Sequence, residues 1–211
     1  MRLVLASNNA VKLTELRALL ADLPLSIVAQ GELGIAEADE PHLTFIENAL
    51  AKARQAAQAS GGPAIADDSG LCVHALDGAP GVISAHFAGA LSATAGESRE
   101  ALRSRQDGQN NAVLLARLAG VADRRAHFIS TLVALRHAHD PEPLVAVGRW
   151  PGEIGHRPAG QGGFGYDPLM VIADLQATVA ELDAAVKNRH SHRALAAAHM
   201  RELMRQAWHL N

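Results

Sequence analysis

Short apolar runs alternate along this chain with longer stretches in which apolar residues recur every three or four positions. The first pattern is typical of a buried strand, and the second is typical of an amphipathic helix. Strands are predicted at residues 2–6, 25–30, 64–66, 126–136 and 144–150. Helices are predicted at residues 11–20, 44–59, 111–118 and 191–210. Because strands alternate with helices, the pattern predicts an α/β protein.

Polar segments between these elements refine the prediction. Residues 137–143 are polar, contain two prolines and join two predicted strands as a hairpin loop, which favours a mixed sheet over a purely parallel one. Thr44 and Glu47 have the spacing of a capping box, which starts the second helix. Residues 89–110 are rich in Ser, Gly, Gln, Arg and Glu, so we expect an exposed excursion or a connection between two lobes there.

Composition and charge limit the class of protein. A length of 211 residues fits one domain or two closely joined lobes, and 48% hydrophobic residues suffice for a folded core. The net charge of -3 argues against a broad surface for nucleic acid or anionic membrane, because such surfaces need a large basic excess. A single cysteine excludes an internal disulfide framework. The chain shows neither a signal peptide nor an apolar run near the roughly 18 residues of a membrane-spanning helix. We therefore expect a cytoplasmic protein.

The turn after the first strand places Lys12 in the opening turn of a helix. A cation there opposes the helix dipole, whereas a phosphate would meet the backbone amides, the dipole and the ammonium together. The alternative is that Ser7 or Asn9 only caps the helix and that Lys12 is solvated. The candidate phosphate loop comprises Ser7, Asn8, Asn9, Ala10, Val11 and Lys12.

Two adjacent carboxylates, Asp67 and Asp68, come at the end of the third predicted strand. Because neighbouring side chains of an extended chain point to opposite sides, a metal bound by one of them needs a partner from elsewhere. The acidic loop before the second helix offers three candidates, Glu37, Asp39 and Glu40. Hard oxygen ligands suit Mg²⁺, which completes its shell with water and substrate phosphates. The alternative is a solvated acidic turn ahead of Gly70, and a contact between Asp67 and the metal stays open.

Residues 160–165 match the pattern G-x-G-x-x-G, but no strand precedes them and no helix follows, so we reject a dinucleotide fingerprint. Phe164 lies between two glycines, and Tyr166 follows closely in a chain with only 3% aromatic residues. An aromatic ring without bulky neighbours favours a stacking platform for a planar ligand. The alternative is a core aromatic beside a bulge.

The last predicted helix begins with a cationic pair. Ser191 suits the cap position, which puts His192 and Arg193 in the first turn, where positive charge is disfavoured. Electronegative ligand atoms would explain this placement. Arginine can donate to O6 and N7 of a 6-oxopurine, whereas adenine presents an amino donor at position 6. The alternative is a solvated helix face.

Taken together, five segments resemble the inosine triphosphate (dITP/XTP) pyrophosphatase family in order and approximate spacing. They are residues 7–12 with Glu15, residues 43–49, 66–71 and 163–168, and residues 191–193 after Lys187. The resemblance covers nearly the whole chain and implies that residues 1–211 form a single nucleoside triphosphate pyrophosphatase domain. It implies an elongated mixed β-sheet flanked by helices, two lobes with a central cleft, and a homodimer.

The resemblance also implies Mg²⁺-dependent hydrolysis of dITP, ITP and XTP to the nucleoside monophosphate and pyrophosphate. By position it makes Asp68 the general base, Glu40 and Asp68 the metal ligands, and residues 7–12 the phosphate loop. The other substrate-binding residues that it implies are Ser69, Phe164, Gly165, Tyr166, Asp167, Lys187, His192 and Arg193. Two departures stand out: the family often has glycine at the positions of Asn8 and Val11, and residues 89–110 form a longer excursion than it commonly needs.

The chemistry of the reaction agrees with this assignment. Cleavage between the α and β phosphates needs a water aimed at the α phosphorus, a carboxylate to accept its proton, and cations to neutralise the departing pyrophosphate. Asp68 suits the carboxylate, and Lys12 with Mg²⁺ suits the cations.

Two other functions fit the same residues. The first is a pyrophosphatase for modified pyrimidine or methylated nucleotides on a similar sheet, which His192 and Arg193 disfavour without excluding. The second is a nucleotide-binding regulatory module without turnover. The pairing of Asp68 with Glu40 argues against that module, because binding alone needs no base.

Overall fold

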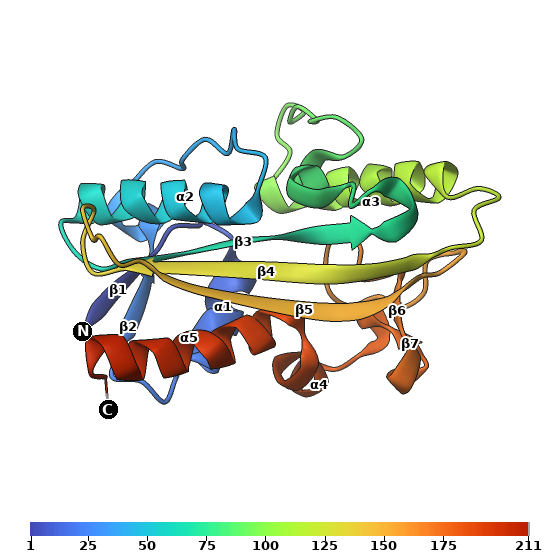
Figure 1. The fold of residues 1–211 in the computed structure, drawn as a ribbon. Helices are drawn as coiled ribbons and strands as arrows, with labels where there is room; N and C mark the ends of the chain where they lie inside the picture. The colour runs from blue at the N-terminus through green and yellow to red at the C-terminus, as the bar shows by residue number, and fades with distance from the viewer. Residues whose placement is uncertain (211) are drawn as a thin grey trace. The chain divides into compact units, whose positions relative to one another are not determined.

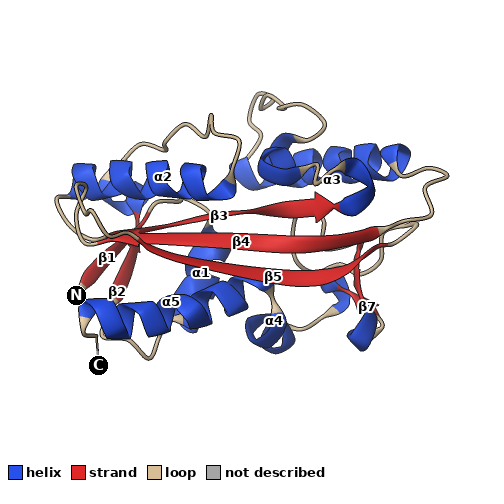
Figure 2. Cartoon of the chain, in the orientation of Figure 1, coloured by secondary structure: helices blue, strands red, loops and turns tan. Residues whose placement is uncertain are grey.

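The structure, a computed structural model, describes residues 1–210. The strands are β1 (Arg2–Leu5), β2 (Ser26–Ala29), β3 (Ala64–Val73), β4 (Arg125–Leu135), β5 (Leu144–Ile154), β6 (Met170–Ile172) and β7 (Ala177–Thr178). The α-helices are α1 (Ala10–Leu19), α2 (Phe45–Ser60), α3 (Arg99–Arg117), α4 (Ala184–His190) and α5 (His192–Trp208) (Figure 2).

The strands form one sheet in the order β2-β1-β3-β4-β5-β6-β7. Strand β1 pairs in parallel with β2 and with β3, with Leu3 opposite Ile27 and Leu5 opposite Ile65. Strand β6 pairs antiparallel with β5 and with β7. The predicted α/β class with a mixed sheet flanked by helices is therefore confirmed.

The chain divides into two compact units. The first consists of Met1–Ser69, Ile129–Arg149 and residues 188–210, and the second consists of Gly70–Phe128 and Trp150–Lys187. No helix among the described residues is both long and apolar enough to cross a membrane.

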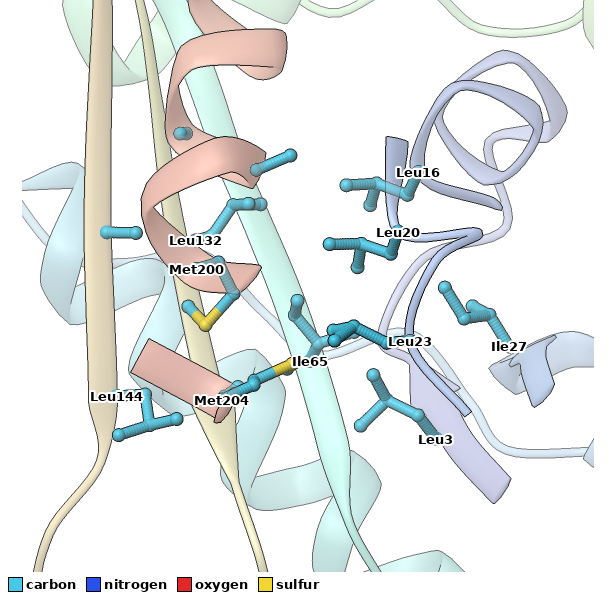
Figure 3. Packing of buried hydrophobic residues seen from close by; sticks show 14 of the residues in the cluster. Leu3, Leu16, Leu20, Leu23, Ile27, Ile65, Leu132, Leu144, Met200 and Met204 are labelled. Carbon is cyan, nitrogen blue, oxygen red and sulfur yellow. The ribbon is translucent and has the colours of Figure 1, made fainter. Parts of the chain in front are cut away.

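Helices cover both faces of the strands in the first unit (Figure 1). On one face, Leu16 and Leu20 from the end of α1 and Met200 and Met204 from α5 pack around Ile65 of β3 (Figure 3). Their spacing of four residues places each pair on one side of its helix. On the other face, α2 packs through alanines, a stripe made of Ala49, Ala53, Ala56 and Ala57. Because these side chains are small, the backbone of α2 lies close to the strands. The longer side chain of Lys52, on the same helix, reaches β3.

The second unit has its own core, which holds four of the seven aromatic residues, Phe87, Phe128, Trp150 and Tyr166. Tyr166 is 4% exposed, and its hydroxyl donates a hydrogen bond to the Ser84 carbonyl oxygen at 2.9 Å. The interpretation of Tyr166 as part of an exposed aromatic platform was therefore wrong, and the alternative of a core aromatic is correct for this residue.

Two predicted boundaries were also wrong. Helix α3 begins at Arg99 rather than at residue 111, because the Ser98 hydroxyl accepts a hydrogen bond from the Ala101 N–H and caps a largely polar helix. The polar composition of residues 99–110 reflects exposure of a helix and not a loop. Strand β3 continues to Val73, so Asp67 and Asp68 lie within the strand rather than after it.

Candidate active site

Strand β3 carries Asp67 and Asp68 to opposite sides, as the two-residue period of a strand predicts. Asp67 is 1% exposed and accepts hydrogen bonds at both of its oxygens. Ser130 donates to Oδ1 at 2.9 Å, and the Arg193 guanidinium donates to Oδ2 at 2.9 Å. The Lys12 ammonium lies 3.2 Å from Oδ2. We call this cluster in the first unit the Asp67 network.

The Asp67 network keeps its carboxylate ionised. Burial alone would raise the pKa of Asp67, but Arg193 and Lys12 hold that pKa well below its usual range. Because both oxygens already accept hydrogen bonds from the protein, Asp67 organises the surrounding cations. These contacts do not favour the open possibility that it also binds a metal.

On the other side of β3, Asp68 pairs with Lys52 of α2. The Lys52 ammonium lies 2.9 Å from Asp68 Oδ1 and 2.8 Å from Glu40 Oε1. Burial alone would lower the pKa of Lys52, but Asp68 and Glu40 raise it. One buried ammonium thus joins the two carboxylates that the sequence singled out, which supports the choice of Glu40 within the acidic loop.

The Asp68 carboxylate has the properties of a base with metal-binding capacity. Burial raises its pKa, although Lys52 opposes the change. Its Oδ2 atom is buried and accepts no hydrogen bond from residues 1–210. The described residues contain no group of three or more histidine, cysteine, aspartate and glutamate side chains that could hold a metal ion. Asp68 and Glu40 offer two hard ligands, which fits Mg²⁺, since that ion takes one or two carboxylates and completes its shell with water and phosphate oxygens.

The candidate phosphate loop, residues 7–12, is built as a helix start. Asn9 Oδ1 accepts hydrogen bonds from the N–H groups of Val11 and Lys12 at 3.1 and 3.3 Å, so Asn9 caps α1 as the alternative interpretation held. Ser7 Oγ accepts from the Asn9 N–H at 3.1 Å. Lys12 is not solvated, however, because its side chain is 15% exposed and pairs with Asp67. Burial lowers the pKa of Lys12.

Arg193 belongs to the Asp67 network and is 2% exposed. Besides Asp67, it contacts Glu15 of α1 in an ion pair and donates to Ser69 Oγ at 3.1 Å. The sequence attributed the cation at the start of α5 to electronegative ligand atoms, whereas the protein itself supplies two carboxylate partners, Glu15 and Asp67. The alternative of a solvated helix face is wrong for Arg193, whereas His192 is half-buried beside it.

The N-terminus of α5 comes very close to β5. A Cβ atom at Gly148 would overlap the His192 carbonyl oxygen and the Ala196 backbone nitrogen. Only glycine therefore permits this approach, which sets the position of His192 and Arg193.

In the second unit, residues 163–167 form what we call the aromatic loop. Asp167 Oδ2 accepts hydrogen bonds from the Phe164 N–H at 3.1 Å and from the Lys187 ammonium at 2.9 Å. Gly163 has a φ of +75°, and a Cβ there would overlap the Asp167 carboxylate. Phe164 is half-buried, and the Lys187 ammonium lies 5.6 Å from its ring centroid. The structure thus brings Phe164, Asp167 and Lys187 together, as the resemblance implied.

Several residues that shape these clusters had no role in the prediction from the sequence. Lys52 and Ser130 contact the two aspartates of β3, and Asp107 and Asn111 of α3 bond to Gly165. Of these four residues, only Lys52 could have been recognised from the sequence. Together with Asn48, one turn earlier, it falls on the alanine face of α2, and a lysine at such a position needs a buried partner.

Comparison with known proteins identifies the family to which this chain belongs. A model of the Ham1 family matches residues 3–203, a range that includes the Asp67 network, Lys52 and the aromatic loop. The chain belongs to the Ham1 family. Two curated relatives bear the name dITP/XTP pyrophosphatase, so the resemblance drawn from the sequence is confirmed. The relative from Leptothrix cholodnii is 67% identical over 211 residues and is covered in full, as is this chain. The relative from Methylibium petroleiphilum is 64% identical over 208 residues, which are 99% of each chain.

Solved structures of Ham1 proteins have the same fold. A HAM1 protein from Coxiella burnetii aligns with a TM-score of 0.87 and 38% identity over 98% of this chain and 100% of the other. The Ham1 protein of Staphylococcus aureus aligns with a TM-score of 0.81 and 32% identity over 98% and 99% of the two chains.

Proposed function

We propose that this Ham1 protein hydrolyses deaminated purine nucleoside triphosphates, namely dITP, ITP and XTP, to the nucleoside monophosphate and pyrophosphate. The observation that carries the proposal is the Asp68 carboxylate, which is buried on one side against Lys52 and has no hydrogen bond from residues 1–210 at Oδ2. A module that only bound nucleotides would not need such a base. The curated relatives are named dITP/XTP pyrophosphatase, which supports the same reaction with dITP and XTP.

In the proposed reaction, Asp68 accepts a proton from the water that attacks the α phosphorus. The bond between the α phosphorus and the bridging oxygen breaks, and pyrophosphate leaves with the electron pair. The raised pKa of Asp68 strengthens it as a base, and Lys52 keeps it ionised and oriented. Glu40 and Asp68 would hold Mg²⁺, which supplies positive charge to the phosphate oxygens.

Residues 7–12 are proposed to bind the triphosphate, with Lys12 as the cation beside the departing pyrophosphate. Asp67 and Asp68 help Lys12 to keep its charge, because burial lowers its pKa and these two carboxylates raise it. Ser69 completes the polar surface that this unit offers to the substrate, since its hydroxyl donates to Asp67 Oδ2 at 3.3 Å.

The nucleoside is assigned to the aromatic loop and to the start of α5. Phe164 offers a ring face for stacking, and Gly165, Tyr166, Asp167 and Lys187 shape the segment around it. His192 and Arg193 are proposed to donate to O6 of the base. Guanine is disfavoured when its 2-amino group lacks a partner.

The proposed function is tested with purified protein, Mg²⁺ and a panel of dITP, XTP, dUTP, ATP and GTP. Pyrophosphate and orthophosphate are measured separately. We expect pyrophosphate from dITP and XTP only. Orthophosphate release would show that a different bond is cleaved, pyrophosphate from dUTP alone would favour a pyrimidine enzyme, and no release would favour a binding module.

The proposal also includes an oligomeric state and a cellular location. We propose a cytoplasmic homodimer of a single catalytic domain, on the basis of the family resemblance. Analytical ultracentrifugation of the purified chain distinguishes the dimer from a monomer.

A further inference from the structure

Helix α3 presents a polar stripe to the aromatic loop. Arg103, Asp107 and Asn111 recur every four positions, so their side chains lie on one face of the helix. The Asp107 carboxylate accepts a hydrogen bond from the Gly165 N–H at 2.7 Å, and the Asn111 amide donates to the Gly165 carbonyl oxygen at 3.0 Å. The helix therefore holds both the N–H and the carbonyl group of Gly165, the residue that follows Phe164.

The third member of the stripe, Arg103, contacts the Phe164 ring itself. The central guanidinium carbon lies 5.0 Å from the ring centroid, within the range of a cation–π interaction. The Lys187 ammonium lies 5.6 Å from the same centroid. Two cations from α3 and α4, which are far apart in the sequence, thus share one aromatic ring.

These two cations differ in how their charge is compensated. Lys187 forms an ion pair with Asp167 at 2.9 Å. Arg103 is half-buried, and its guanidinium donates no hydrogen bond within the described chain. Asp107, one turn away, accepts the Gly165 N–H and attracts Arg103 electrostatically without forming an ion pair with it. Arg103 therefore brings an available positive charge and planar donors to the ring that is proposed to stack the base.

We propose that Arg103 is a specificity-determining residue that favours a purine base with negative charge. The inference rests on the proposed function, in which Phe164 stacks the base. Xanthine loses a ring proton close to neutral pH and becomes an anion, whereas hypoxanthine stays neutral. A guanidinium next to the stacking ring attracts the anionic base and changes the binding of the neutral base much less. Arg103 thus raises kcat/KM for XTP relative to kcat/KM for ITP.

The preference depends on pH through the base and not through the protein. The charged groups that face the Phe164 ring are Arg103 and Asp107 from α3, Asp167 from the aromatic loop, and Lys187 from α4. At acidic pH both bases are neutral, and the advantage of XTP disappears. As the pH rises through the ionisation of xanthine, the advantage appears.

The test compares kcat/KM for XTP and ITP, which share the same sugar, from acidic to mildly alkaline pH. The variants are Arg103→Gln, Arg103→Lys and a matched control, Arg117→Gln. Arg117 lies on the same helix, with its guanidinium carbon 4.7 Å from the Phe87 ring centroid, so the control removes the same charge and the same kind of contact elsewhere. Thermal unfolding of each variant verifies that the fold is retained.

We expect Arg103→Gln to lower kcat/KM for XTP about tenfold more than for ITP at neutral pH. The difference closes at acidic pH, Arg103→Lys keeps most of the preference, and Arg117→Gln leaves the ratio unchanged. An equal loss for both substrates at every pH, or an unchanged ratio in Arg103→Gln, overturns the inference. Wild-type protein that releases pyrophosphate from neither substrate overturns the proposed function itself, and this result is visible before any variant is compared.

Discussion

The Lys52 ammonium lies 2.9 Å from Oδ1 of Asp68, while Oδ2 of the same carboxylate is buried without a hydrogen bond from residues 1–210. Oδ1 thus holds the side chain in place, and Oδ2 remains able to accept a proton. The same ammonium reaches Glu40 at 2.8 Å. This arrangement suits the proposed role of Asp68 as a base, because the atom that holds the side chain in place is not the atom that would accept the proton.

The acidic limb of the pH profile reports the Asp68 carboxyl. Asp68 must be ionised to accept a proton, and burial raises its pKa above the ordinary value of 3.8. Activity is therefore lost, as the pH falls, at a higher pH than an ordinary aspartate would give. A profile of kcat and kcat/KM against pH measures this limb. Full activity down to the ordinary aspartate range contradicts the assignment.

Replacement of Lys52 moves that limb. Lys52 lowers the pKa of Asp68, so Lys52→Met raises this pKa further and shifts the acidic limb to higher pH. Turnover at neutral pH falls at least about tenfold, because Asp68 also loses its anchor. Lys52→Arg, which keeps the charge, preserves the position of the limb. A limb that stays in place in Lys52→Met would instead belong to the phosphates of the substrate.

The Asp67 network is expected to stabilise the folded state. Asp67→Asn leaves Arg193 and Lys12 buried beside a neutral amide, and the free energy of unfolding falls by about 3 kcal/mol at neutral pH. The pKa of Asp67 is lowered in the folded protein, so its contribution is complete above the ordinary value of 3.8 and is lost only as the pH falls below it. Urea unfolding of both proteins at several pH values measures the difference. A variant as stable as the wild type at neutral pH would refute a stabilising network.

Gly148 is expected to accept no side chain. Gly148→Ala places a methyl group against the backbone of His192 and Ala196, which displaces the start of α5 and costs about 2 kcal/mol of unfolding free energy. The control is Gly108→Ala, within α3, where a Cβ meets nothing within 4 Å and stability rises by about 0.5–1 kcal/mol. Thermal unfolding measures both changes. If the two substitutions had the same effect, close packing at Gly148 would not be the cause.

Local rules account for what the sequence predicted correctly. The opposite directions of Asp67 and Asp68 follow from the period of a strand. The spacing of Thr44 and Glu47 placed the start of α2, where the Thr44 hydroxyl accepts the Glu47 N–H at 3.3 Å and donates to the Glu47 carboxylate at 2.6 Å. The need of Arg193 for negative partners followed from the helix dipole. The identity of those partners did not, because Glu15 and Asp67 are distant in the sequence and only the fold brings them to α5.

The failures share a physical cause. Composition reports exposure more directly than it reports conformation, so the polar start of α3 resembled a loop. Tyr166 lies in a glycine-rich segment but is buried by residues from other elements. Contacts made across the fold, such as those of Ser130 and Asp107, leave no local pattern at all.

Asp68 is proposed to be the general base for pyrophosphate release, and this role can be tested on its own. Its most direct test is the rate of pyrophosphate release from dITP, with Mg²⁺ present, by the wild type and by Asp68→Asn. The amide keeps the shape of the side chain but cannot take a proton, so we predict that turnover falls by about a thousandfold or more while the circular dichroism spectrum stays that of the wild type. Near-normal pyrophosphate release by Asp68→Asn would contradict the claim.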